Sequence, residues 1–164
     1  KRNTSGKKKV AIVGYTNSGK STLLNTISKA GIYADDKLFA TLETTSRNIW
    51  LGDNKQIILT DTVGFINKLP HMLVDAFAST LEEALDADLI LHVVDISNPD
   101  YKKQINVVNS TLKEIGADDI PQIIAYNKCD KIHEALQLSE NEIFISAKTG
   151  KNIEELKELI KQKV

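Results

Sequence analysis

The stretch VAIVGYTNSGKS, residues 10–21, joins an apolar run to two glycines, a lysine and a serine. Gly14–Ser21 fits the pattern G-x-x-x-x-G-K-S, which lies between a strand and a helix. Val10–Val13 predicts the strand, and Lys20 opens a predicted helix that extends to about Ala30. Backbone N–H groups of such a turn and the positive end of the helix bind phosphate groups. The stretch therefore predicts a nucleoside triphosphate site in an α/β fold.

Outward from this stretch, predicted strands and helices alternate. Apolar stripes beginning near Leu73, Tyr101 and Ile153 predict further helices. We expect an α/β fold of three layers, with a mostly parallel six-stranded sheet, one antiparallel edge strand and about five helices. The antiparallel strand comes from a hairpin that turns at residues 52–54. The short apolar runs that predict the strands are Val10–Val13, Asn48–Leu51, Ile57–Leu59, Leu89–Val94, Ile123–Tyr126 and Ile143–Ile145.

Length and composition restrict the class of protein. The 164 residues suit one domain, with residues 1–8 as a disordered tail or linker remnant and residues 9–164 as the nucleotide-binding domain. A net charge of −1 argues against a dedicated nucleic-acid-binding domain. No apolar stretch approaches the ~20 residues that span a bilayer. The single cysteine, Cys129, fits a reducing cytosol, so we expect a cytoplasmic domain. We also expect the domain alone to be a monomer.

The base of the nucleotide is indicated by Asn127-Lys128-Cys129-Asp130, which directly follows a predicted strand. The carboxylate of Asp130 can accept hydrogen bonds from both N1–H and the 2-amino group of guanine, and adenine has neither donor there. Asn127 can tie this loop to the phosphate loop, and the stem of Lys128 can cover the base. Ser146-Ala147-Lys148 resembles the loop whose backbone N–H groups approach the base oxygen. The sequence therefore predicts a guanine nucleotide.

The phosphate groups and a Mg²⁺ ion have their own expected partners. Lys20 places a positive charge on the β- and γ-phosphates, and Ser21 offers a hydroxyl to Mg²⁺. Asp61 follows a strand and can hold Mg²⁺ through a water molecule. The backbone N–H of Gly64 can reach the γ-phosphate, a contact that is lost when this group leaves.

Residue chemistry leaves open which threonine binds Mg²⁺ and what Asn17 does. The polar, threonine-rich segment 35–47 should supply a threonine to the Mg²⁺ shell, and Thr41, Thr44 and Thr45 are equal candidates. Asn17 occupies the fourth position of the phosphate loop, as in GTPases activated by potassium. Its amide oxygen could help to bind K⁺, or it could simply form hydrogen bonds within its loop.

Four segments together resemble the GTPase domain of the HflX family, within the translation-factor-related class of P-loop GTPases. They are GYTNSGKSTLLN (14–25), DKLFATLETTSR (36–47), DTVGFINKLPHMLVDAFASTLEEALDADLILHVVD (61–95) and NKCD (127–130). The resemblance covers about Val10 to Val164. It implies the P-loop GTPase fold, hydrolysis of GTP to GDP and phosphate, and a switch role on the large ribosomal subunit. It also implies that Thr41 is the metal-binding threonine.

The motifs and the resemblance together define the expected site. Lys20, Gly64 and Asn17 are the expected catalytic residues, and Ser21, Thr41 and Asp61 are the expected metal ligands. The expected nucleotide-binding residues are Gly14, Tyr15, Thr16, Asn17, Ser18, Gly19, Lys20, Ser21, Thr22, Phe39, Ala40, Thr41, Asp61, Gly64, Asn127, Lys128, Asp130, Ser146, Ala147 and Lys148.

The chain also departs from the family pattern. HflX proteins carry an amino-terminal domain and a helical linker, so we expect this chain to be an excised GTPase domain that lacks much of the ribosome-binding surface. Phe65 stands where Ras-type enzymes have a water-orienting glutamine, so we expect slow intrinsic turnover. The alternative is a regulatory GTP-binding module that acts through a protein partner other than the ribosome. A phosphate-transferring kinase is disfavoured because the chain has only Arg2 and Arg47 for an arginine-rich lid.

Overall fold

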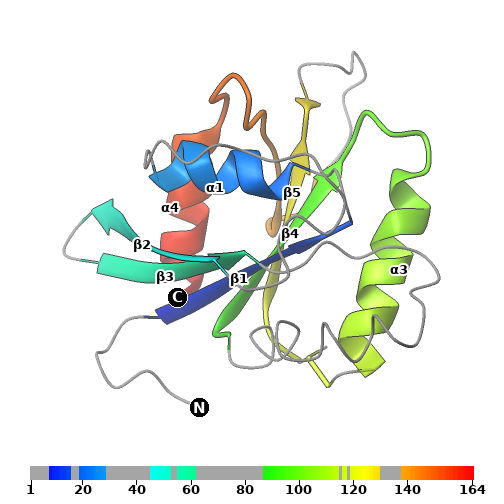
Figure 1. Ribbon diagram of the computed structural model, residues 1–164, viewed down its shortest axis with the longest axis horizontal. Helices are drawn as coiled ribbons and strands as arrows, with labels where there is room; N and C mark the ends of the chain where they lie inside the picture. The colour runs from blue at the N-terminus through cyan, green and yellow to red at the C-terminus, as the bar shows by residue number, and fades with distance from the viewer. Residues whose placement is uncertain are drawn as a thin grey trace.

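A six-stranded sheet forms the centre of the computed structural model, in the strand order β2-β3-β1-β4-β5-β6 (Figure 1). The structure describes residues 8–15, 19–28, 45–52, 55–61, 87–114, 116–117, 119–129 and 138–164. All six expected strands are present, and the α/β prediction is confirmed. Their bounds are β1 Lys8–Gly14, β2 Thr45–Gly52, β3 Lys55–Asp61, β4 Leu89–Asp95, β5 Gln122–Asn127 and β6 Glu142–Phe144.

The β2–β3 hairpin makes the single antiparallel pair of this sheet, and β2 lies at its edge. The register shifts between Trp50 and Gly52, which marks a bulge next to the turn. Ile49 is buried, whereas Trp50, the only tryptophan of the chain, is 56% exposed. This alternation is typical of an edge strand with one face on the core. The predicted antiparallel edge strand is confirmed.

Helices cover both faces of the sheet and complete the three layers. The described helices are α1 Lys20–Ser28, α3 Tyr101–Glu114 and α4 Ile153–Lys163. Helices α1 and α4 share one apolar core with the sheet, and α3 packs on the opposite face (Figure 1). The helix expected near Leu73 lies outside the described residues. Of the helices that are described, none is long and apolar enough to cross a membrane.

Helix α3 ends at Glu114, and Gly116 closes its C-terminus. Gly116 has a positive φ of 84°, and its N–H donates to the carbonyl of Lys113 at 3.1 Å. The N–H of Ala117 donates to the carbonyl of Leu112 at 2.8 Å. These two bonds form a Schellman motif, which satisfies the last carbonyl groups of the helix.

His92 is a buried titratable residue in the middle of β4. It is 1% exposed and lies on the same strand face as Val94, which packs with residues of α3. Within the described part of the chain, its Nδ1 has no hydrogen-bond partner. Burial disfavours the charged imidazolium and lowers the pKa of His92 from 6.5 to about 4. The imidazole is therefore neutral in the folded domain near pH 7.

The strand order places the ends of four parallel strands at one edge of the sheet. Gly14, Asp61, Asp95 and Asn127 are the last residues of β1, β3, β4 and β5. After β1, strands β2 and β3 add to one side of β1 in the sheet, and β4 adds to its other side. Ligands of such sheets bind outside the carboxyl ends of the strands at this switch point. The fold therefore brings the predicted phosphate and base motifs to the same edge.

Candidate nucleotide-binding site

The phosphate-loop motif is preceded by the strand and followed by the helix that it predicts. Gly14 ends β1, Tyr15 follows it half-buried, and Lys20 begins α1. The N–H of Leu23 donates to the carbonyl of Gly19 at 2.9 Å, which closes the first turn of the helix. Gly19 itself has a φ of +98°, a conformation that L side chains rarely adopt. Gly19 therefore leads directly into the positive end of α1.

Lys20 lies at this helix end with little contact with solvent. It is 9% exposed, and the first turn of α1 contains no acidic residue. The charge of Lys20 and the positive end of the helix therefore add. Phosphate oxygens are suitable further partners for an ammonium group at this position. This position fits the predicted contact with the β- and γ-phosphates.

Gly19 is also required because the side chain of Asn127 packs against it. A Cβ atom on Gly19 would overlap Nδ2 of Asn127 and lie 3.4 Å from its Cγ. Asn127 ends β5 and is 2% exposed. The first residue of the base-recognition motif is therefore in contact with the phosphate loop, as the sequence predicts.

Asn127 also reaches the loop after β6. Its Oδ1 accepts a hydrogen bond from the N–H of Ala147 at 2.9 Å. The carbonyl of Ala147 accepts a hydrogen bond from Oγ1 of Thr26, in α1, at 2.7 Å. Both backbone groups of Ala147 are thus held by side chains from other elements. The Ala147 N–H donates within the protein, so guanine could receive only a shared hydrogen bond from this group.

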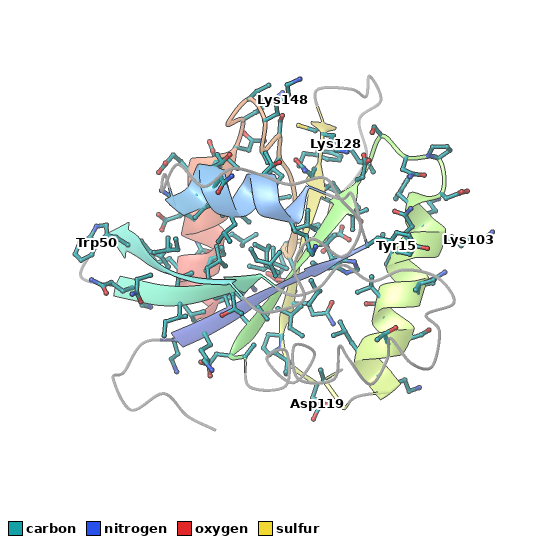
Figure 2. All side chains as sticks on the ribbon, viewed as in Figure 1. Tyr15, Trp50, Lys103, Asp119, Lys128 and Lys148 are labelled. Atoms are coloured by element: carbon teal, nitrogen blue, oxygen red, sulfur yellow. The ribbon has the colours of Figure 1, made fainter. Side chains whose placement is uncertain are left out.

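The loop around Ser146 and Lys148 is closed by short-range hydrogen bonds. Ser146 is buried, its N–H donates to the carbonyl of Lys151 at 3.1 Å, and the N–H of Gly150 donates to the Ser146 carbonyl at 2.8 Å. Lys148 is exposed at the tip. Figure 2 shows Lys148 and Lys128 at the same end of the sheet. Lys148 therefore lies at the same end of the sheet as the base motif, to which Lys128 itself belongs.

Lys128 is held in an unusual conformation beside β4. Its φ is 66°, and its Nζ donates to Oδ2 of Asp95 at 3.0 Å. The side chains of Lys128 and Asp95 are 32% and 13% exposed. The other carboxylate oxygen, Oδ1, accepts hydrogen bonds from the N–H and the hydroxyl of Ser97, at 3.0 and 2.5 Å.

The family follows from comparison with known proteins. Residues 9–128 match the model of a family described as 50S ribosome-binding GTPase. The chain belongs to this GTPase family. It is 55% identical over 154 residues to GTPase HflX of Lacrimispora saccharolytica, a match that covers 92% of the chain and 36% of the relative. It is 50% identical over 155 residues to GTPase HflX of Caldanaerobacter subterraneus, which covers 94% of the chain and 36% of the relative.

Solved structures agree with this assignment. A GTP-binding protein from Sulfolobus solfataricus, in complex with GDP, has a TM-score of 0.73 and 32% sequence identity to this GTPase domain. The match covers 94% of this chain and 51% of that one. The resemblance to HflX GTPases and the P-loop GTPase fold are therefore confirmed. The chain spans about a third of the length of the curated relatives.

Part of the expected site of the GTPase domain lies outside the described residues. Ser21 belongs to α1 and Asp61 to β3, but only their backbone is described. Thr22 is half-buried in α1. The residues outside the described part are Thr16, Asn17, Ser18, Phe39, Ala40, Thr41, Gly64, Phe65 and Asp130. The expected roles of all the site residues stay predictions.

Sequence reasoning about this GTPase domain missed Asp95 and Thr26. Asp95 ends a buried parallel strand, a position at which ligand-site residues are common, so its location was a usable signal. Thr26 gave no such signal because it is one of several polar residues in α1. Its partner, Ala147, is 121 positions away in the sequence.

Proposed function

We propose that this chain binds GTP and hydrolyses it to GDP and phosphate in a Mg²⁺-dependent reaction. It acts as a nucleotide-controlled switch on the large ribosomal subunit in the cytoplasm. The observation that carries the proposal is the position of Asn127. Its side chain contacts Gly19 of the phosphate loop and accepts a hydrogen bond from Ala147. One nucleotide can therefore occupy both loops at once.

The phosphate end of the proposed site suits a triphosphate with Mg²⁺. Lys20 contacts the β- and γ-phosphates from the end of α1. Ser21, Thr41 and Asp61 would hold the metal, and their hydroxyl and carboxylate oxygens are the ligands that Mg²⁺ takes in proteins. An ion held by these residues would neutralise charge that develops on the phosphate oxygens. The N–H of Gly64 donates a hydrogen bond to the γ-phosphate, and this bond is lost when the phosphate leaves.

The base end of the proposed site selects guanine. Asp130 accepts hydrogen bonds from N1–H and the 2-amino group, and an adenine base would leave its carboxylate unpaired. The stem of Lys128 covers one face of the base. Asn127 sets the distance between this loop and the phosphate loop.

Turnover of the isolated domain should be slow. Phe65 follows Gly64, and a phenyl ring can neither donate a hydrogen bond to a water molecule nor accept one from it. We expect intrinsic turnover on the order of that of Ras alone, ~10⁻⁴–10⁻³ s⁻¹, or below. A partner must then order the site, and the family description points to the large ribosomal subunit as that partner.

Purified large ribosomal subunits should accelerate GTP hydrolysis by this chain at least ~10-fold, a barrier reduction of about 1.4 kcal/mol. Phosphate release is measured with and without subunits in potassium buffer. A Lys20→Ala variant, which lacks the phosphate contact, controls for contaminating GTPases.

The full-length relative from L. saccharolytica gives the second comparison in this assay. If the relative is stimulated and this chain is not, the docking surface lies outside this chain. If this chain binds GDP and neither protein is stimulated, the ribosome role is contradicted. A protein partner other than the ribosome then becomes the better hypothesis.

Potassium should increase turnover relative to sodium if the Asn17 amide oxygen helps to bind a cation beside the phosphates. We propose this role and expect a several-fold higher rate in KCl than in NaCl at equal ionic strength. Asn17→Ala should remove the difference while leaving slow turnover. Equal rates of the unaltered chain in the two salts would show that Asn17 only stabilises its own loop.

A further inference from the structure

We propose that Asp95 is a positioning residue for the guanine base. It holds the Lys128 side chain in place before the nucleotide arrives. This inference rests on the proposed function, because it names a residue outside the recognised motifs that prepares the same site.

The fold brings Asp95 to the base motif through the pairing of β4 and β5. Asp95 and Asn127 are register partners at the ends of these two strands. The N–H of Ile96 donates to the carbonyl of Asn127 at 3.1 Å, so the two segments remain paired one residue beyond the end of β4. The carboxylate of Asp95 is therefore fixed relative to the residue that precedes Lys128.

The carboxylate is also fixed in orientation. Oδ1 accepts two hydrogen bonds from Ser97, one from its N–H and one from its hydroxyl. Oδ2 then points to Nζ of Lys128, at 3.0 Å. A carboxylate that is held from one side presents its second oxygen in a defined direction. Asp95 can therefore act as a template for the lysine.

The backbone of Lys128 is constrained on both sides. Its φ of 66° is uncommon for a residue that is not glycine. The preceding residue, Asn127, is buried. The N–H of the following residue, Cys129, donates to the carbonyl of Ile145 at 3.1 Å. Unusual backbone conformations persist where their surroundings determine them, and they are common in functional sites. The backbone conformation fixes the direction in which the Lys128 side chain leaves the backbone, and Asp95 fixes the position of its Nζ.

A role in folding does not explain this ion pair well. The Lys128 side chain is 32% exposed, and ion pairs with this access to water contribute little to stability. A lysine side chain loses much rotamer freedom when it is ordered. Ordering it before binding reduces the entropy that the nucleotide must overcome. The geometry therefore fits a contribution to binding of the base rather than to folding.

The test compares GDP with pyrophosphate, which occupies the phosphate loop without a base. We expect Asp95→Ala to weaken GDP binding about tenfold and to leave pyrophosphate binding unchanged, as measured by calorimetry. Asp95→Asn keeps the shape and an acceptor oxygen, so it should recover part of the affinity. Glu154→Ala is the matched control. It removes the exposed ion pair with Lys157, at 3.5 Å, in α4 and should change neither affinity.

A double-mutant cycle shows whether Asp95 acts through Lys128. The affinity of Asp95→Ala/Lys128→Ala for GDP should equal that of Lys128→Ala alone. The inference is overturned if Asp95→Ala binds GDP as the unaltered chain does, or if it loses GDP and pyrophosphate affinity equally. The inference is also overturned if the two substitutions are additive. Failure of the unaltered chain to bind GDP would instead contradict the proposed function.

Discussion

Gly19→Ala should lower the free energy of unfolding by ~2–4 kcal/mol and weaken GDP binding by a factor of ~30–1000. Two costs add. Alanine at a φ of +98° is strained, by about 1–2 kcal/mol. The new Cβ also overlaps Nδ2 of the buried Asn127, which must move. Because Asn127 holds Ala147, its movement displaces the phosphate and base loops together. Stability is measured by urea unfolding followed by far-UV circular dichroism, and affinity by calorimetry.

Gly116→Ala is the matched control for this prediction. Gly116 has a φ of +84°, but an added Cβ meets nothing within 4 Å. We therefore expect only the backbone cost, about 1–2 kcal/mol, and unchanged GDP affinity. Equal losses of stability and affinity in the two variants would show that contact between Gly19 and Asn127 has no special role.

Acidification from pH 6.5 to pH 4 should destabilise the domain through His92 by up to ~3 kcal/mol. The pKa of His92 is about 4 in the folded state, and the reference value for the unfolded chain is 6.5. Above pH 6.5 both states hold neutral imidazole, so stability is complete. As the pH falls below 6.5, the unfolded chain binds a proton that the folded chain excludes. The free energy of unfolding therefore decreases until the pH reaches about 4.

His92→Leu separates this effect from other titrating groups. Leucine is apolar and does not titrate, so the variant should lose the His92 contribution to the pH dependence. Between pH 5 and 6 the slope of unfolding free energy against pH should be lower by about 1.2 kcal/mol per unit than in the unaltered chain. Identical slopes would mean that His92 becomes protonated without unfolding of its surroundings.

The order of strands and helices could be predicted because each element has a local signal. The β-branched runs, the hairpin turn and the glycine after α3 act within a few residues. The phosphate loop is also local, since strand, glycines, lysine and helix are consecutive. Element ends were less accurate: Ile145 was predicted in a strand, but β6 ends at Phe144. The N–H of Ile145 still donates to the carbonyl of Tyr126, at 2.8 Å.

The contacts that join the candidate site could be predicted only in part. The approach of Asn127 to the phosphate loop was expected from its motif. The bonds from Thr26 to Ala147 and from Asp95 to Lys128 were not, because their partners are 121 and 33 positions apart. No local pattern shows which polar side chain will meet which carbonyl or ammonium group. Such pairs become visible only when the sheet register is known.

The exposed position of Trp50 determines which optical signal reports on this domain. Its indole already contacts water in the folded state, with 56% of the residue exposed. Unfolding changes its surroundings little, so intrinsic fluorescence will be a weak measure of denaturation. Any molecule that covers the β2 edge will move the only indole of the chain into an apolar environment. Its emission should then shift to shorter wavelength, which gives a label-free titration of binding at that edge.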